Sequence, residues 1–190
     1  MEESLSQEIR ETESENRLQT ESIENINGPG QRQVQEAEWA EYIEKISVLL
    51  RLSSVDIRAY SPLTLAYIGD GVYDLAVRTV LVNRGNCKPH KLHLHCCRLV
   101  RASAQAKVLE LFEKEGVLTE DEQAVCRRGR NAKPATMAKN ATEADYKKAT
   151  GFEALIGYLY LTGQIQRMLT LIRRSLDILE PRQQDCDKRV

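Results

Sequence analysis

Apolar residues recur at helical spacing along most of the chain, and no segment alternates between apolar and polar residues as a half-buried β-strand does. The segment that follows Ser61 has the clearest boundaries. Serine is a favoured N-cap, Pro62 suits the first helical position, and Gly85 suits the position just beyond the last turn. The pattern predicts a long helix here and an all-α fold for the whole chain.

Capping residues and helix breakers predict further helices on both sides of this segment. Thr119 and Glu122 fit a capping box, while Gly163 and Pro181 separate and end the last two helical patterns. The expected helices cover residues 36–52, 89–116 with a break near Ser103, 119–129 ending near Gly129, 143–161 and 164–179. We expect the apolar side of the first of these to pack on the rest of the protein.

Charge is distributed unevenly along the chain, although the formal net charge is only −1. Residues 1–50 carry 12 acidic and 4 basic side chains, whereas the other 140 residues carry 16 acidic and 23 basic ones. An acidic segment before a basic body is typical of a body that binds a polyanion. We expect an acidic, disordered leader over 1–35, one domain over 36–180 that begins with a helix and linker over 36–60, and a flexible tail over 181–190.

The cysteines indicate a cellular compartment. There are five of them, an odd number, and no two form a Cys-x-x-Cys pair. No apolar run is long enough for a signal peptide or a membrane span. These features favour a reducing environment, and we expect the protein to be cytoplasmic.

Two acidic residues stand in otherwise apolar helical segments. Asp70 lies between two glycines, each of which weakens a helix by roughly 1 kcal/mol, and Glu153 is the only charged residue within 151–161. A buried carboxylate needs a cationic partner or a metal ion. Both residues are therefore candidate metal ligands. The alternative is that Asp70 is a surface acid and that Glu153 pairs with a core arginine, Arg78 or Arg101.

A basic, polar stretch, expected to form a loop, follows the helix predicted to end near Gly129. Its side chains can donate hydrogen bonds to phosphate oxygens, although a merely solvated surface is the alternative. The candidate phosphate-contacting residues are Arg127, Arg128, Arg130, Asn131, Lys133, Lys139 and Asn140.

The sequence His-Leu-His-Cys-Cys at 93–97 contains residue types that bind zinc. On a helix only His93 and Cys97, four positions apart, share a face, and a structural zinc site needs four ligands. We therefore interpret these residues as ordinary helix positions.

Three motifs together resemble the ribonuclease III family. The stretch LAYIGDGVYDL, which contains Asp70, resembles the signature helix of that family, and FEALIGYLYL, which contains Glu153, resembles its second acidic motif. The intervening RGRNAK is similar to the Mini-III branch, which has the catalytic domain and lacks the double-stranded-RNA-binding domain. The resemblance covers about residues 62–179.

This resemblance implies a helical bundle that works as a homodimer and cleaves double-stranded RNA with Mg²⁺, for which Mn²⁺ can substitute. The substrate implied by the branch is the precursor of 23S ribosomal RNA, within a large-subunit precursor, and the basic stretch is then expected to contact RNA. Since double-stranded RNA is recognised largely by shape and phosphates, a basic surface suits that task.

Only two of the family's four acids are present here. Carried over by position, Asp70 and Glu153 match catalytic metal ligands, whereas Ala66 and Thr150 replace the other two. The Mini-III branch resembles this reduced pattern, and Mg²⁺ commonly takes one or two carboxylates and keeps several waters. Asp74 either orients a metal-bound water or forms a surface pair with Arg78. Whether one or two ions act stays open.

Two other functions are alternatives to this nuclease activity. A non-catalytic double-stranded-RNA-binding or ribosome-assembly factor with the same fold is favoured by the loss of the two acids. An unrelated helical metal-dependent phosphohydrolase would need histidine ligands, and the three histidines all lie within 90–95, away from both acidic motifs.

Overall fold

The computed structural model describes residues 45–46, 48–51, 56–132 and 142–181. Contacts divide the chain into two compact units, Met1–Leu52 and Ser53–Val190. In the first unit, residues 45–46 and 48–49 are helical. Most of the helix expected over 36–52, the expected leader and almost all of the expected tail lie outside the described residues.

The second unit is built from helices, and its described part contains no strand, which confirms the all-α prediction. The elements are the 3-10 turn η1 (Ile57–Ala59) and the helices α3 (Pro62–Asn83), α4 (Pro89–Val100), α5 (Ala102–Lys114), α6 (Glu120–Asn131), α7 (Glu143–Leu161) and α8 (Ile165–Leu179). None of these helices is both long and apolar enough to cross a membrane.

Most helix boundaries follow the local signals in the sequence. The Ser61 hydroxyl accepts the backbone N–H of Thr64 at the start of α3, and Gly85 has a φ of 142° just after that helix. The capping box of α6 is confirmed, because Thr119 and Glu122 each accept the other's backbone N–H. Side-chain chemistry therefore determines where these helices begin.

Two boundaries differ from the prediction. The break between α4 and α5 falls at Arg101, whose extended backbone (ψ 151°) interrupts the helix two residues before Ser103. Helix α6 continues past Gly129 to Asn131. Gly129 ends no helix because it stands at a close contact with α7, where a Cβ atom would come within 2.8 Å of the Cα of Gly151.

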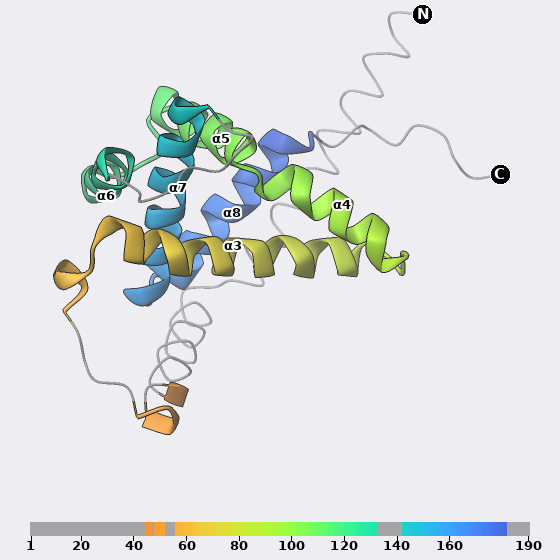
Figure 1. Cartoon of the computed structure of the whole chain (residues 1–190), viewed down its shortest axis with the longest axis horizontal. Coiled ribbons are helices and arrows are strands. Elements are labelled where there is room, and N and C mark those ends of the chain that lie inside the picture. Colours follow the sequence, from red (N-terminus) through yellow and green to blue (C-terminus); the bar gives the residue numbers. More distant parts are fainter. Residues whose placement is uncertain (1–44, 47, 52–55, 133–141, 182–190) are drawn as a thin grey trace, which may run out of the picture. The chain divides into compact units, whose positions relative to one another are not determined.

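Helix α7 lies at the centre of the bundle and packs against α3, α5, α6 and α8 (Figure 1). Its Phe152 is fully buried and meets the ring of Tyr73 from α3 edge to face, with 5.0 Å between centroids. The ring of Phe112 from α5 lies 6.4 Å from that of Phe152, measured between centroids. Such burial supplies much of the stabilisation of a fold, and it fixes the position of Glu153, the next residue in α7.

Candidate active site

Helices α3 and α7 cross at very short range because glycines stand at the contact. A Cβ atom at Gly69 of α3 would overlap the backbone carbonyl oxygen of Glu153, and one at Gly157 of α7 would overlap the carbonyl oxygen of Leu65. Only residues without a side chain permit this approach. The crossing brings Asp70, which follows Gly69 in α3, close to Glu153 in α7.

Glu153 is mostly buried at this crossing. Burial is the largest cause that raises its pKa, and the nearby charge of Asp70 raises it further, to about 8. The side-chain amide of Gln105, from α5, opposes this shift by a smaller amount. Burial and the charge of Asp70 both favour the protonated form of Glu153.

Asp70 is exposed to solvent. Partial burial still raises its pKa, and the charge of Asp74 raises it further. Gly71 leaves open space beside it, since a Cβ atom there would meet no other atom within 4 Å. A ligand in solution can reach this carboxylate.

Neither Asp70 nor Glu153 forms an ion pair through its carboxylate with any residue that the structure describes. Arg78 instead pairs with Asp74, with 2.5 Å between Nε and Oδ2, and Cys96 donates its S–H to the other Asp74 oxygen at 3.3 Å. The expected surface pair of Asp74 and Arg78 is confirmed. The alternative that Glu153 serves as the partner of Arg78 is wrong.

The donor set fits a magnesium ion better than a zinc ion. Across the described ranges, no group of three or more His, Cys, Asp or Glu side chains is placed to hold a metal. Thr150 is buried and donates its hydroxyl to the carbonyl oxygen of Tyr146 in its own helix, and Ala66 is also buried. Two carboxylates remain, and they suit a hard cation that keeps most of its waters.

The histidine and cysteine pair on α4 does not make a zinc site either. The Sγ atom of Cys97 lies 3.5 Å from Nε2 of His93, as their helical spacing predicts. No third ligand joins them in the part of the chain that is described. The interpretation of these residues as ordinary helix positions stays a prediction.

The first four candidate phosphate-contacting residues lie on α6, where a loop was expected. Arg127 is exposed, and no ion pair joins it to the described residues. Arg128 donates to the carbonyl oxygen of Tyr60 at 3.3 Å, and Arg130 forms an ion pair of 2.9 Å with Glu113. The last turn of α6 is thus a helical basic surface in which two of the three arginines have intramolecular partners.

The fourth of these candidates ends the helix, and the remaining three follow it in the sequence. Asn131 is the exposed last residue of α6. Lys133, Lys139 and Asn140 lie outside the described residues.

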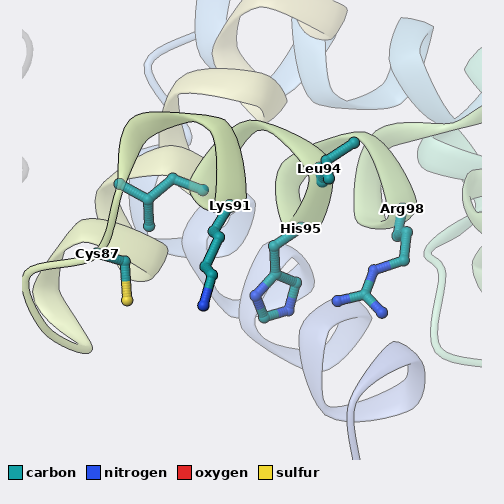
Figure 2. A pocket seen from close by; sticks show the side chains of 6 residues that line it. Cys87, Lys91, Leu94, His95 and Arg98 are labelled. Carbon is teal, nitrogen blue, oxygen red and sulfur yellow. The ribbon is translucent and has the colours of Figure 1, made fainter.

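Helix α4 presents a basic side that sequence reasoning did not single out. Figure 2 shows Lys91, His95 and Arg98 pointing to the same side of the helix, along a hollow of about 620 Å³. His95 also contacts Glu180, at the end of α8. The missed signal is in the composition: residues 75–109 contain seven Lys or Arg residues and no Asp or Glu.

Comparisons with known proteins match the part of the chain that carries both acids. A family model described as the ribonuclease III domain matches residues 63–164. The chain is 48% identical over 119 residues to the Mini-ribonuclease 3 of Symbiobacterium thermophilum, an alignment that covers 63% of this chain and 90% of the relative. It is 41% identical over 126 residues to the Mini-ribonuclease 3 of Streptococcus pneumoniae, covering 66% of this chain and 98% of the relative.

A solved structure has a similar fold. The crystal structure of a protein from Fusobacterium nucleatum superposes with a TM-score of 0.59 at 29% identity. The superposition covers 65% of this chain and 98% of that one.

Proposed function

Because this chain belongs to the ribonuclease III family and is an endoribonuclease of the Mini-ribonuclease 3 type, we propose that Asp70 and Glu153 hold the metal ion at which it cleaves double-stranded RNA. Enzymes of this family depend on a metal ion and act on double-stranded RNA. The observation that carries the proposal is the pair of neighbouring carboxylates with no cationic partner among the described residues. Two acids placed together without a counter-charge destabilise a fold unless a cation joins them.

We propose Mg²⁺ as that ion, with Mn²⁺ able to replace it. When bound, such an ion supplies charge for the scissile phosphate and the leaving oxygen and lowers the pKa of water. Asp70 and Glu153 would hold this ion, with Glu153 as the more buried ligand and Asp70 as the exposed one. No side chain has to act as a nucleophile.

Substrate positioning is assigned to basic side chains outside the carboxylate pair. The exposed Arg127 at the end of α6 can contact phosphates directly, and the candidates beyond Asn131 extend the same run of positive charge. Lys91 and Arg98 on α4 add a second basic surface. Phosphate contacts of this kind place the duplex without reading its bases.

We further propose that the enzyme works as a homodimer. Three large apolar side chains of α3 are exposed in the single chain, Tyr67 at 84%, Leu75 at 67% and Val82 at 62%. Their separations of eight and seven residues place them on one side of the helix. An apolar strip on one helix is what a two-fold interface with a second copy would cover.

The precursor of 23S ribosomal RNA, within a large-subunit precursor, is the substrate we propose, by similarity to the Mini-ribonuclease 3 relatives. The expected cytoplasmic location stays a prediction.

A cleavage assay on the full chain tests the proposal. A long RNA duplex and a single strand of the same sequence are incubated with the protein in Mg²⁺, in Mn²⁺ and in EDTA, and sedimentation gives the oligomeric state. We expect cleavage of the duplex alone, with either ion and not in EDTA, by a dimer. Duplex cleavage that persists in EDTA contradicts the metal site, and an active monomer contradicts the dimer.

A further inference from the structure

Gln105 on α5 is a polar side chain that is fully buried. It is 0% exposed, and neither its Nε2 nor its Oε1 atom has a hydrogen-bond partner in the described part of the molecule. A buried amide without partners costs roughly 1–3 kcal/mol. Such a cost in a native fold calls for an explanation, such as an ion or water that completes the contacts.

The other buried polar residues of the described chain are all satisfied. Glu122 accepts from Arg167, Thr150 donates to a backbone carbonyl, and Ser175 contacts the hydroxyl of Tyr73 at 3.2 Å. These residues stabilise the fold through completed hydrogen bonds. Gln105 differs from them, so a purely structural role does not explain it.

The surroundings of Gln105 indicate what it could serve. Helix α5 packs directly on α7, and the Gln105 amide lies close enough to Glu153 to favour the ionised carboxylate. Even so, neither polar atom of Gln105 has a partner at ordinary hydrogen-bond geometry among the described residues. An ionised carboxylate accepts hydrogen bonds and has no proton to donate, so the amide N–H of Gln105 is a suitable donor for it.

We propose that Gln105 is a positioning residue for the metal site, an inference that rests on the proposed role of Glu153. With a cation at Glu153, the Nε2–H of Gln105 would donate to the Glu153 carboxylate and hold that side chain in one orientation. Residues that hydrogen-bond to a metal ligand typically act in this way, and their loss weakens metal binding by roughly 10- to 100-fold.

The test is ion binding by the full chain without RNA. Free Mn²⁺ is followed by electron paramagnetic resonance during titration, Mg²⁺ affinity comes from competition, and thermal unfolding is recorded in EDTA. The variants are Gln105→Leu and Gln105→Met, which keep the volume but remove the amide. Gln123→Leu on α6 is the matched control, because Gln123 donates to the carbonyl oxygen of Leu118 at 3.1 Å and lies outside the site.

Both Gln105 variants should bind the ions roughly 10- to 100-fold more weakly. Their metal-free unfolding temperature should stay equal or rise, because an unsatisfied amide has been removed. The control should bind ions normally and unfold at a slightly lower temperature. If Gln105 served only in packing, both Gln105 variants would instead unfold at a lower temperature than wild type.

Glu153→Gln, measured in parallel, separates the two ways in which the idea can fail. Normal ion binding by the Gln105 variants, with binding lost in Glu153→Gln, overturns the role of Gln105 and leaves the metal site in place. Normal ion binding by Glu153→Gln overturns the metal site itself. A fall in the metal-free unfolding temperature of both Gln105 variants also overturns the positioning role.

Discussion

Two glutamates shielded from solvent in this bundle have opposite environments. Glu122 on α6 is 3% exposed, and it accepts two hydrogen bonds from Arg167, with 2.8 Å and 2.9 Å between the heavy atoms, and one from the Thr119 backbone. These contacts lower its pKa despite burial. Glu153 on α7 faces another carboxylate and an unsatisfied amide, and its pKa rises to about 8.

The difference shows how a structural acid can be told from a functional one. Burial acts on both side chains in the same direction, so burial alone does not distinguish them. The partner of each side chain distinguishes them. The guanidinium of Arg167 neutralises Glu122 within the fold, whereas nothing in the described chain neutralises Glu153. A buried carboxylate without a cationic partner in the fold is a candidate ligand for a bound cation.

Removing each acid should therefore affect different properties. Glu153→Gln and Asp70→Asn remove only a negative charge and keep the shape, so duplex cleavage in Mg²⁺ should fall below detection while the fold persists. Glu122→Gln should cleave at a rate near wild type at a temperature where it is folded. Near-normal turnover by either site variant would show that the pair is not the metal site.

Stability, in contrast to cleavage, should depend on Glu122. Glu122→Gln leaves Arg167 without its anionic partner, which should lower the free energy of unfolding by roughly 2–4 kcal/mol, near the lower end expected for a buried pair because Arg167 is partly exposed. Thermal unfolding in EDTA measures this loss. An unfolding temperature equal to wild type would mean that the Glu122 and Arg167 pair contributes little.

The pH dependence of stability should separate the two glutamates as well. The pKa of Glu153 is raised, from 4.5 to about 8, so its contribution is fully present below pH 4.5 and is lost as the pH rises toward 8. Metal-free wild type should accordingly lose stability across this window, on the order of a few kcal/mol by pH 8. Glu153→Gln should not.

The contribution of Glu122 to stability depends on pH in the opposite direction. Its pKa is lowered, so its contribution is present above pH 4.5 and is lost only as the pH falls through the lowered value. Chemical unfolding of wild type, Glu153→Gln and Glu122→Gln at pH 5, 6, 7 and 8 in EDTA compares the two. Parallel curves for wild type and Glu153→Gln would contradict the raised pKa.

The sequence predicted the helices more completely than the site. Capping residues such as Ser61 and Thr119 act locally, so their signals can be read from neighbouring positions. The lone charge of Glu153 in an apolar helix and its motif likewise identified a candidate. Gln105 was missed because its meaning depends on α5 packing against α7, a contact that no local pattern contains. Gly129 looked like a helix end for the same reason, since its role is the close contact with α7.

A weaker version of the same contrast applies to two arginines of α6. Arg127 is exposed, whereas Arg130 is paired with Glu113. Arg127→Ala should reduce the slope of log duplex affinity against log salt concentration by roughly one unit, the value for one lost phosphate contact. Arg130→Ala should change the slope less. Duplex binding in EDTA over a salt series gives both slopes, and an unchanged line for Arg127→Ala would remove that residue from the RNA surface.

Direct measurement of Mg²⁺ binding in the presence of RNA is the most direct test of the metal site. Mg²⁺ is titrated calorimetrically into wild type, Glu153→Gln and Glu122→Gln, each saturated with a duplex whose phosphates resist cleavage. We predict that wild type and Glu122→Gln bind the ion with similar affinity and that Glu153→Gln does not bind it. Binding by Glu153→Gln equal to wild type would contradict the assignment of Asp70 and Glu153 as the metal-binding pair.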